Sequence, residues 1–270
     1  MNNSNISNAP KVLFLSHGGG PMPLLGDVGH KELVANLKTM SERIGKPSAM
    51  IVISAHWEAN CPIITSAAQP TLVYDFRGFP PESYQIEYPA PGNPLLASKI
   101  HALLNKYGLG AELDGQRGFD HGLFVPLKIM YPKADIPCVQ VSLVNTLDPR
   151  QHIRIGQALS ELRHENLLIV GSGFTFHNMR AFFSPPDVEV QNMNESFEAW
   201  LIDTCSNRDI DEQERTHRFE NWQQAPFARY CHPREEHLLP LHVCYGVSQR
   251  ACSQVFELRV LGKKASAYIW

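Results

Sequence analysis

The sequence predicts an α/β fold, a single domain with a central, mostly parallel or mixed sheet that helices cover on both faces. Residues 11–15, 49–54 and 167–173 are short, continuous apolar runs, which are typical of strands buried on both faces. A stretch with helical periodicity, residues 31–44, lies between the first two runs. Strand, helix and strand in this order indicate parallel α/β architecture.

The first half of the chain alternates between these elements and one long irregular segment. The helix predicted at residues 31–44 carries apolar side chains at near-helical spacing, and Gly45, Lys46 and Pro47 stop it. Prolines and aromatic residues crowd residues 62–94, and proline disfavours a regular helix there. We therefore expect a long ordered loop or lid, followed by a helix at residues 94–107.

The second half repeats the alternation and ends in strands. The pattern predicts strands at residues 137–143 and 167–173 and helices at residues 149–163, 192–202 and 236–245. Two edge or antiparallel strands are expected at residues 255–260 and 266–270. The sequence contains no internal repeat and no Gly/Ser-rich linker. We therefore expect one catalytic domain, residues 11–270, after a disordered leader, residues 1–10.

Composition excludes several classes of partner. A net charge of −3 gives no field that would attract nucleic acid or anionic lipid, so we expect neither partner. The six cysteines are widely spread without a Cys-x-x-Cys pair, which favours reduced thiols in the cytoplasm. No apolar run approaches the roughly 18 residues of a membrane span. Whether the chain forms a homo-oligomer stays open.

Four histidines share an informative context. His17, His56, His177 and His237 each lie in or beside a short turn, and the first three follow predicted strands. Ligands of α/β proteins collect at the carboxyl ends of the strands, so these side chains can converge on one point. Neutral imidazole is a strong ligand for zinc and iron, and three protein ligands are usual in catalytic sites. The pattern suggests a metal site, with one histidine left for proton transfer.

The remaining histidines are weaker candidates. His121, beside Asp120, could hydrogen-bond a substrate oxygen or bound dioxygen, or be structural. Near the end of the chain, spacing alone does not choose between Glu236 and His237 as a ligand. We expect His217 and His242 to be structural. Four others should occupy exposed helix positions, namely His30, His101, His152 and His164.

Other chemistries have little support. Neither phosphate-binding nor dinucleotide-binding glycine motifs follow a predicted strand. Ser172 stands between two glycines but lacks the Gly-x-Ser-x-Gly elbow of serine hydrolases. Trp57 could form the wall of an apolar pocket or belong to the core.

Several short motifs together resemble a known family. They are Ser16-His17-Gly18, Ser54-Ala55-His56-Trp57, Tyr74-Asp75-Phe76 with Gly78-Phe79-Pro80, Tyr88-Pro89-Ala90-Pro91-Gly92, Gly118-Phe119-Asp120-His121-Gly122, Ser172-Gly173 with His177-Asn178, and Glu236-His237 with Leu239-Pro240-Leu241. In this order, from about Val12 to the C-terminus, the chain resembles the class III extradiol ring-opening dioxygenases related to the catalytic subunit of protocatechuate 4,5-dioxygenase, specifically their DOPA-dioxygenase branch.

The resemblance implies an enzyme that adds both atoms of dioxygen to a catecholic ring next to the diol. It implies a non-haem metal, nominally Fe(II), with His17, His56 and His237 as ligands. His177 matches the base that deprotonates the catechol, and His121 matches a histidine near substrate and oxygen. Such a nitrogen-rich site should also hold Zn(II) in purified protein. The small aromatic diol and O2 are then the expected partners.

One departure from the branch concerns the first motif. It reads His-Gly-Gly-Gly-Pro-Met-Pro where the branch commonly has His-Gly-Ser-Pro, which bears on substrate identity more than on metal binding. Two alternatives remain at this point, namely a zinc-dependent hydrolase on the same scaffold and a non-catalytic binding protein that kept the pocket.

Overall fold

The computed structural model describes residues 10–162, 166–185 and 187–270. Of the expected leader, residues 1–10, only Pro10 falls within these ranges, so that prediction lies outside the described residues. Within them, no helix is both long and apolar enough to cross a membrane.

One mixed sheet of eight strands organises the described residues, in the order β4-β3-β5-β2-β6-β1-β8-β7. Its central strands β5, β2, β6 and β1 are parallel, whereas β3 runs antiparallel to β5, and β8 antiparallel to both β1 and β7. The strands are β1 Lys11–Ser16, β2 Ala49–Ala59, β3 Ile63–Thr65, β4 Glu112–Asp114, β5 Cys138–Val144, β6 Leu167–Gly173, β7 Gln254–Val260 and β8 Lys263–Ile269.

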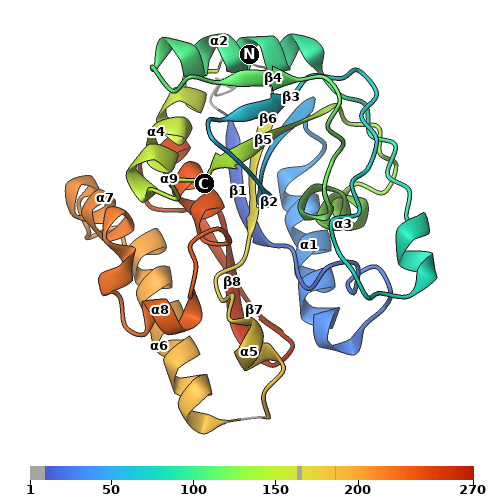
Figure 1. Cartoon of the computed structure of the whole chain (residues 1–270). Coiled ribbons are helices and arrows are strands. Elements are labelled where there is room, and N and C mark those ends of the chain that lie inside the picture. Colours follow the sequence, from blue (N-terminus) through green and yellow to red (C-terminus); the bar gives the residue numbers. More distant parts are fainter. Residues whose placement is uncertain (1–9, 163–165, 186) are drawn as a thin grey trace, which may run out of the picture.

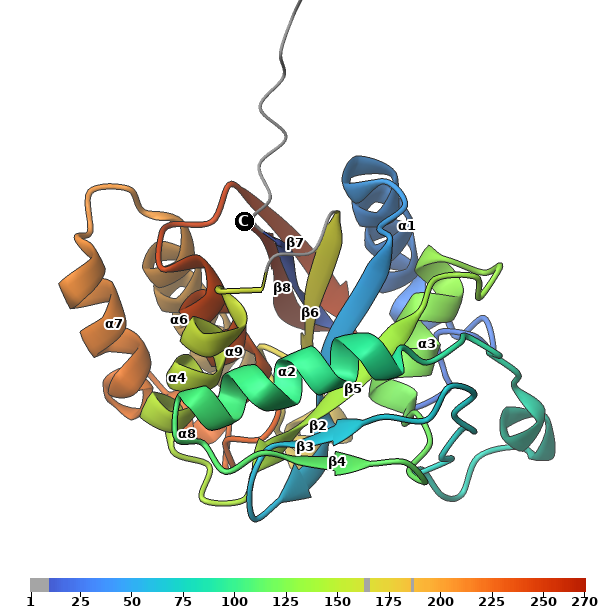
Figure 2. The same ribbon diagram turned by 90° about the horizontal axis from the view of Figure 1, so that it is seen from above.

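Helices cover both faces of this sheet, with α1 and α3 on one side and α4, α6, α7 and α9 on the other (Figures 1 and 2). The helices are α1 Lys31–Ile44, α2 Pro94–Lys106, α3 His121–Met130, α4 Pro149–Leu159, α5 Met179–Phe182, α6 Val188–Ser206, α7 Glu212–Glu220, α8 Ala228–Cys231 and α9 Leu239–Ser248. Short 3-10 turns occupy Val28–His30, Pro81–Gln85 and Trp222–Gln224. The predicted fold class is confirmed.

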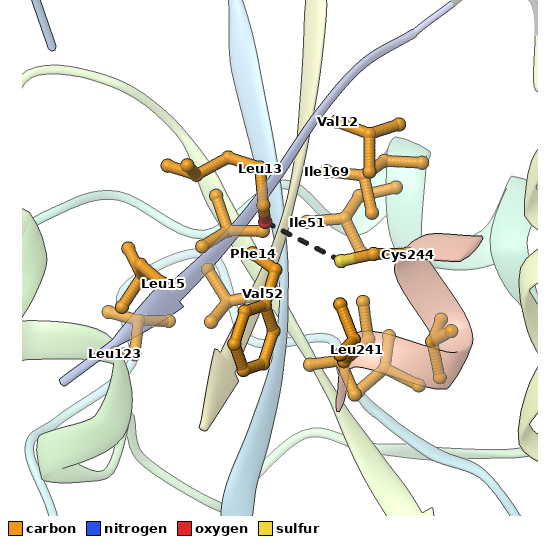
Figure 3. Close-up of a cluster of buried hydrophobic side chains, with 14 of the residues drawn as sticks. Val12, Leu13, Phe14, Leu15, Ile51, Val52, Leu123, Ile169, Leu241 and Cys244 are labelled. Carbon is orange, nitrogen blue, oxygen red and sulfur yellow. Dashed lines mark hydrogen bonds between the residues drawn. The ribbon is translucent and has the colours of Figure 1, made fainter. Parts of the chain in front are cut away.

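The core lies between the central strands and the helices on either side. Leu13 of β1 and Ile51 of β2 are fully buried, because both faces of these strands are covered. Figure 3 shows this cluster with Leu123 of α3 on one side and Leu241 of α9 on the other. The Cys244 thiol of α9 also contacts the Leu13 carbonyl oxygen at 3.5 Å, so α9 packs directly against the strands.

Several element predictions need correction. The helices predicted at 149–163, 192–202 and 236–245 are Pro149–Leu159, Val188–Ser206 and Leu239–Ser248. The segment 62–94 is largely irregular as expected, yet it contains β3 and a 3-10 turn. The sequence pattern predicts neither β4 nor the helices α3, α5, α7 and α8. Pro126 stands inside α3 and hides its periodicity.

Two histidines predicted to be exposed are in fact buried. His30 receives a hydrogen bond from the Gly19 backbone N–H at 3.0 Å and pairs with Asp27 at 2.6 Å, which braces the glycine turn. His152 is buried under the end of β5. His101 is half-buried, and His164 lies outside the described residues. These side chains satisfy backbone groups that would otherwise be unpaired.

Candidate metal centre

The central strands deliver three of the four histidines to one edge of the sheet. β1 ends at Ser16, directly before His17, and β6 ends at Gly173, four residues before His177. β2 continues through His56, and its pairing with β5 shifts register between Ile53 and Glu58. Such a bulge redirects side chains, so His56 turns toward the edge where β1 and β6 end.

His237 reaches the same edge from the turn before α9. The Phe174 backbone N–H, just after β6, donates to the His237 carbonyl oxygen at 2.9 Å. A Cβ atom on Gly173 would stand 2.1 Å from that oxygen, so only glycine permits the approach. Gly171 likewise faces α9, where a Cβ would meet the Cys244 sulfur at 2.6 Å. The two glycines around Ser172 therefore allow β6 to pack closely against the His237 backbone and helix α9.

The imidazoles of His17, His56 and His237 converge. Their Nε2 or Nδ1 atoms include a set in which all three lie within 4.8 Å of one another, and the Nε2 atoms of His17 and His56 are 2.9 Å apart. Two nitrogens each about 2.1 Å from one ion stand roughly 3 Å apart when they bind at a right angle. The spacing therefore fits a shared divalent cation.

The second ring nitrogen of each of these histidines faces a polar partner. His17 Nδ1 lies 3.1 Å from the hydroxyl of Ser172, whose own O–H donates to the Gly122 carbonyl. His237 Nδ1 lies 3.0 Å from the Glu236 carboxylate, and His56 Nδ1 lies 3.6 Å from that of Asp75. The hydrogen bonds of His17 and His237 fix the tautomer that leaves Nε2 free to coordinate a metal, and the more distant Asp75 carboxylate favours the same tautomer of His56. The donor set thus fits a metal ion.

Burial keeps these rings neutral. Burial first, and then the neighbouring histidines, lower the pKa of His17 and of His56 well below the ordinary value of 6.5. Burial also lowers the pKa of His237 to about 4. Neutral imidazole is the form that coordinates metals, so the cluster is ready to bind a cation at neutral pH.

His177 lies directly on His237, with ring centroids 3.4 Å apart and planes 14° from parallel. Its Nδ1 is 3.2 Å from Glu236 Oε1, the same oxygen that faces His237. Burial alone would raise the pKa of Glu236, but hydrogen bonds from the two histidines lower it well below its usual range. An ionised Glu236 therefore accepts from both rings and orients them together.

His121 completes the group of five histidines. Its ring centroid is 3.9 Å from that of His56, and its Nδ1 lies 2.8 Å from Asp75. Asp120, the acid beside it in the sequence, instead accepts a hydrogen bond from Ser54 at 2.8 Å. The motif Tyr74-Asp75-Phe76 contains Asp75, but nothing in the sequence alone indicates that its carboxylate pairs with His121.

A cavity of about 380 Å³ opens onto these rings, and all five histidines line it. Its other walls are the glycines after His17 and mostly apolar side chains, namely Met22, Phe76, Phe79, Phe174, Met179, Phe182 and Phe183, with Arg77 beside them. This volume and lining are typical of a small-molecule site. Trp57 is not part of the wall, because it is buried beneath the Arg117 guanidinium.

Two further groups of side chains could hold a cation and compete with the first. They are His56, Asp75 and His121, and His177, Glu236 and His237. Each shares one histidine with the first group, so an ion held by either of them would take a ligand away from the first group. Spacing along the chain left open whether Glu236 or His237 is the ligand. In the structure His237 belongs to the group with His17 and His56, and Glu236 does not.

Comparisons with known proteins agree with this site. Residues 11–265 match the model of the "Catalytic LigB subunit of aromatic ring-opening dioxygenase". The chain is 40% identical over 280 residues to "Dioxygenase tasH" of Hapsidospora irregularis, covering 96% of this chain and 85% of that protein. It is 39% identical over 245 residues to "4,5-DOPA dioxygenase extradiol" of Beta vulgaris, covering 89% and 88%.

A solved structure supports the same relationship. A crystal structure of an uncharacterized protein from Escherichia coli K12 superposes with a TM-score of 0.74 at 27% identity, covering 96% of this chain and 99% of that one. The relatives do not favour the zinc hydrolase. The resemblance noted in the sequence is confirmed: the chain belongs to the LigB family of aromatic ring-opening dioxygenases and is an extradiol ring-cleaving dioxygenase.

Proposed function

We propose that the substrate is a catechol, a small aromatic diol, whose ring is opened next to the diol with O2. In this proposal His17, His56 and His237 hold Fe(II), His177 is the base, and His121 contacts substrate or oxygen. The observation that carries it is the convergence of three imidazole nitrogens within 4.8 Å at the floor of an apolar cavity.

The chain's own residues would bind and deprotonate the diol. The Glu236 carboxylate faces Nδ1 of His177, which keeps that nitrogen protonated and leaves Nε2 as the proton acceptor. The aromatic walls would hold the ring and exclude water from it. Bound Fe(II) would supply the redox couple that O2 chemistry requires, whereas Zn(II) has none.

Oxygen consumption tests the proposal directly. Iron-loaded protein incubated in air with a panel of catechols, DOPA among them, should consume O2 and form a yellow ring-opened semialdehyde. Zinc-loaded protein should not. Background oxygen uptake across the panel would contradict the proposal, and turnover with zinc in the absence of oxygen would instead select the hydrolase.

His177→Ala tests the role of the base. General base catalysis contributes about 10²- to 10⁴-fold, so kcat should fall by that factor while iron content stays equal to that of the wild type. Normal activity in His177→Ala would contradict the assignment.

The proposal also places the protein in the cytoplasm. The six cysteines, one half-buried and five buried, are all free thiols, which suits a reducing compartment.

A further inference from the structure

One cation stands among the apolar walls of the cavity. Arg77 follows Phe76, whose ring is 5.7 Å from that of His121, and precedes Phe79, whose ring lies over Gly20. The segment that carries Arg77 therefore runs from the histidine cluster along the cavity. Arg77 is exposed, and within the described part of the chain its side chain has neither a hydrogen bond nor an ion pair.

Three other arginines around the site are engaged in a way that Arg77 is not. Arg234 makes a bidentate pair with Glu58 at 2.5 and 2.6 Å, and Arg229 pairs with Glu235 at 2.5 Å. Arg117 lies over the Trp57 ring. Arg77 thus offers an unused guanidinium fork to whatever enters the cavity.

Among the described residues, the same cavity offers no carboxylate to pair with a positive charge. Asp75 and Glu236, the nearest acids, face His121, His56, His177 and His237. An ammonium group placed there would gain no counterion and would lie near the like charge of Arg77, which is unfavourable.

We infer that the substrate is a catechol with a carboxylate at the end of a short apolar side chain and without an ammonium group, and that Arg77 binds the carboxylate. This inference rests on the proposed function, because it assigns a substrate class to the same cavity. Phe76 and Phe79 then flank the side chain. DOPA carries both charges and is a poorer fit than its analogue without the amino group.

Calorimetry on zinc-loaded protein tests this without turnover. The probes share one ring and differ in the tail: dihydroxyphenylpropionate, ethylcatechol, DOPA and dopamine. The propionate should bind about tenfold more tightly than ethylcatechol or DOPA, and dopamine should bind most weakly, because only the carboxylate gains a charge-assisted bidentate pair. In Arg77→Gln the advantage of the propionate should disappear, while ethylcatechol binds as before.

Arg180→Gln is the matched control. Arg180 lines the adjoining cavity beside His177 and not this one, and the substitution makes the same change of charge. It should leave all four affinities unchanged. Equal affinity of the wild type for the propionate and ethylcatechol would overturn the inference, as would a preference lost in Arg180→Gln and kept in Arg77→Gln. Failure of every catechol to bind would contradict the proposed function itself.

Discussion

At the scale of single residues, Glu236 links the two histidines on which the proposed chemistry depends. One of its oxygens lies 3.0 Å from His237 Nδ1 and 3.2 Å from His177 Nδ1. The Arg234 guanidinium contacts its other oxygen at 3.3 Å. This carboxylate therefore selects the tautomer of both rings at once, which favours Nε2 as the reactive nitrogen of each.

Glu236→Ala should weaken both metal binding and catalysis. Removing a carboxylate that orients a metal-bound histidine typically costs about 10- to 100-fold in affinity or activity, and here two rings lose their partner. A competition assay with a coloured chelator measures the metal affinity, and oxygen uptake measures kcat/KM.

Glu235→Ala is the control for this change. Glu235 is the preceding residue, but it pairs with Arg229 and not with a histidine. It should retain metal affinity and activity within about twofold, since partly exposed ion pairs contribute little. Equal losses in the two variants would contradict the role given to Glu236.

The sequence predicted the histidines better than their partners. His17, His56, His177 and His237 were identified because each has a recognisable turn or strand end beside it. Most of their partners depend on pairings across the fold, such as His17 with Ser172, 155 positions away, although Glu236 directly precedes His237. Spacing along the chain carries no information on contacts of that range.

At the scale of elements, the end of β6 fixes where His237 stands. Gly173 packs against the His237 carbonyl, and the α4–α9 crossing depends on a similar contact, in which a Cβ on Gly246 would meet the Ile153 carbonyl at 2.1 Å. The two glycines thus have the same steric role at different distances from the site.

Gly173→Ala should lower both stability and metal affinity. The added methyl group forces the His237 backbone away, which costs about 1–3 kcal/mol of unfolding free energy and displaces the ring. Gly246→Ala should lose a similar free energy of unfolding and retain metal affinity. Denaturant titration and chelator competition on both variants check this, and unchanged metal binding in Gly173→Ala would contradict it.

Helix α4 contains a buried histidine that couples stability to pH. His152 Nε2 accepts from the Val144 backbone N–H at 3.1 Å, and Nδ1 lies 2.8 Å from the Asp148 carbonyl oxygen. Burial lowers the pKa of His152 from 6.5 to about 4. The unfolded chain therefore takes up this proton first, so the stabilisation is complete above pH 6.5 and is lost as the pH falls toward 4.

His152→Gln removes the side chain whose protonation makes the free energy of unfolding depend on pH in this range. The variant should be less stable than the wild type at neutral pH, and the difference should shrink by about 3 kcal/mol as the pH approaches 4. Denaturant titrations across this range measure it. A difference that stays constant with pH would show that His152 does not titrate in this way.

At the scale of the whole molecule, hydrophobic periodicity predicted the central strands and the helices that cover them. Runs such as Leu13–Leu15 are apolar because both faces of the central sheet are covered. Periodicity failed where packing overrides local pattern. β3 and β4 have only three residues each, and α7 is strongly polar with only Arg215 and Phe219 buried. Such elements are stabilised by their contacts with the rest of the fold more than by their own sequence pattern.

The position of the metal ion tests the account most directly. Crystals of iron-loaded protein, measured at the iron absorption edge, should give one anomalous peak about 2.1 Å from nitrogens of His17, His56 and His237. A peak among His56, Asp75 and His121, or among His177, Glu236 and His237, would contradict the account, because a histidine proposed to act on the substrate would then be a ligand.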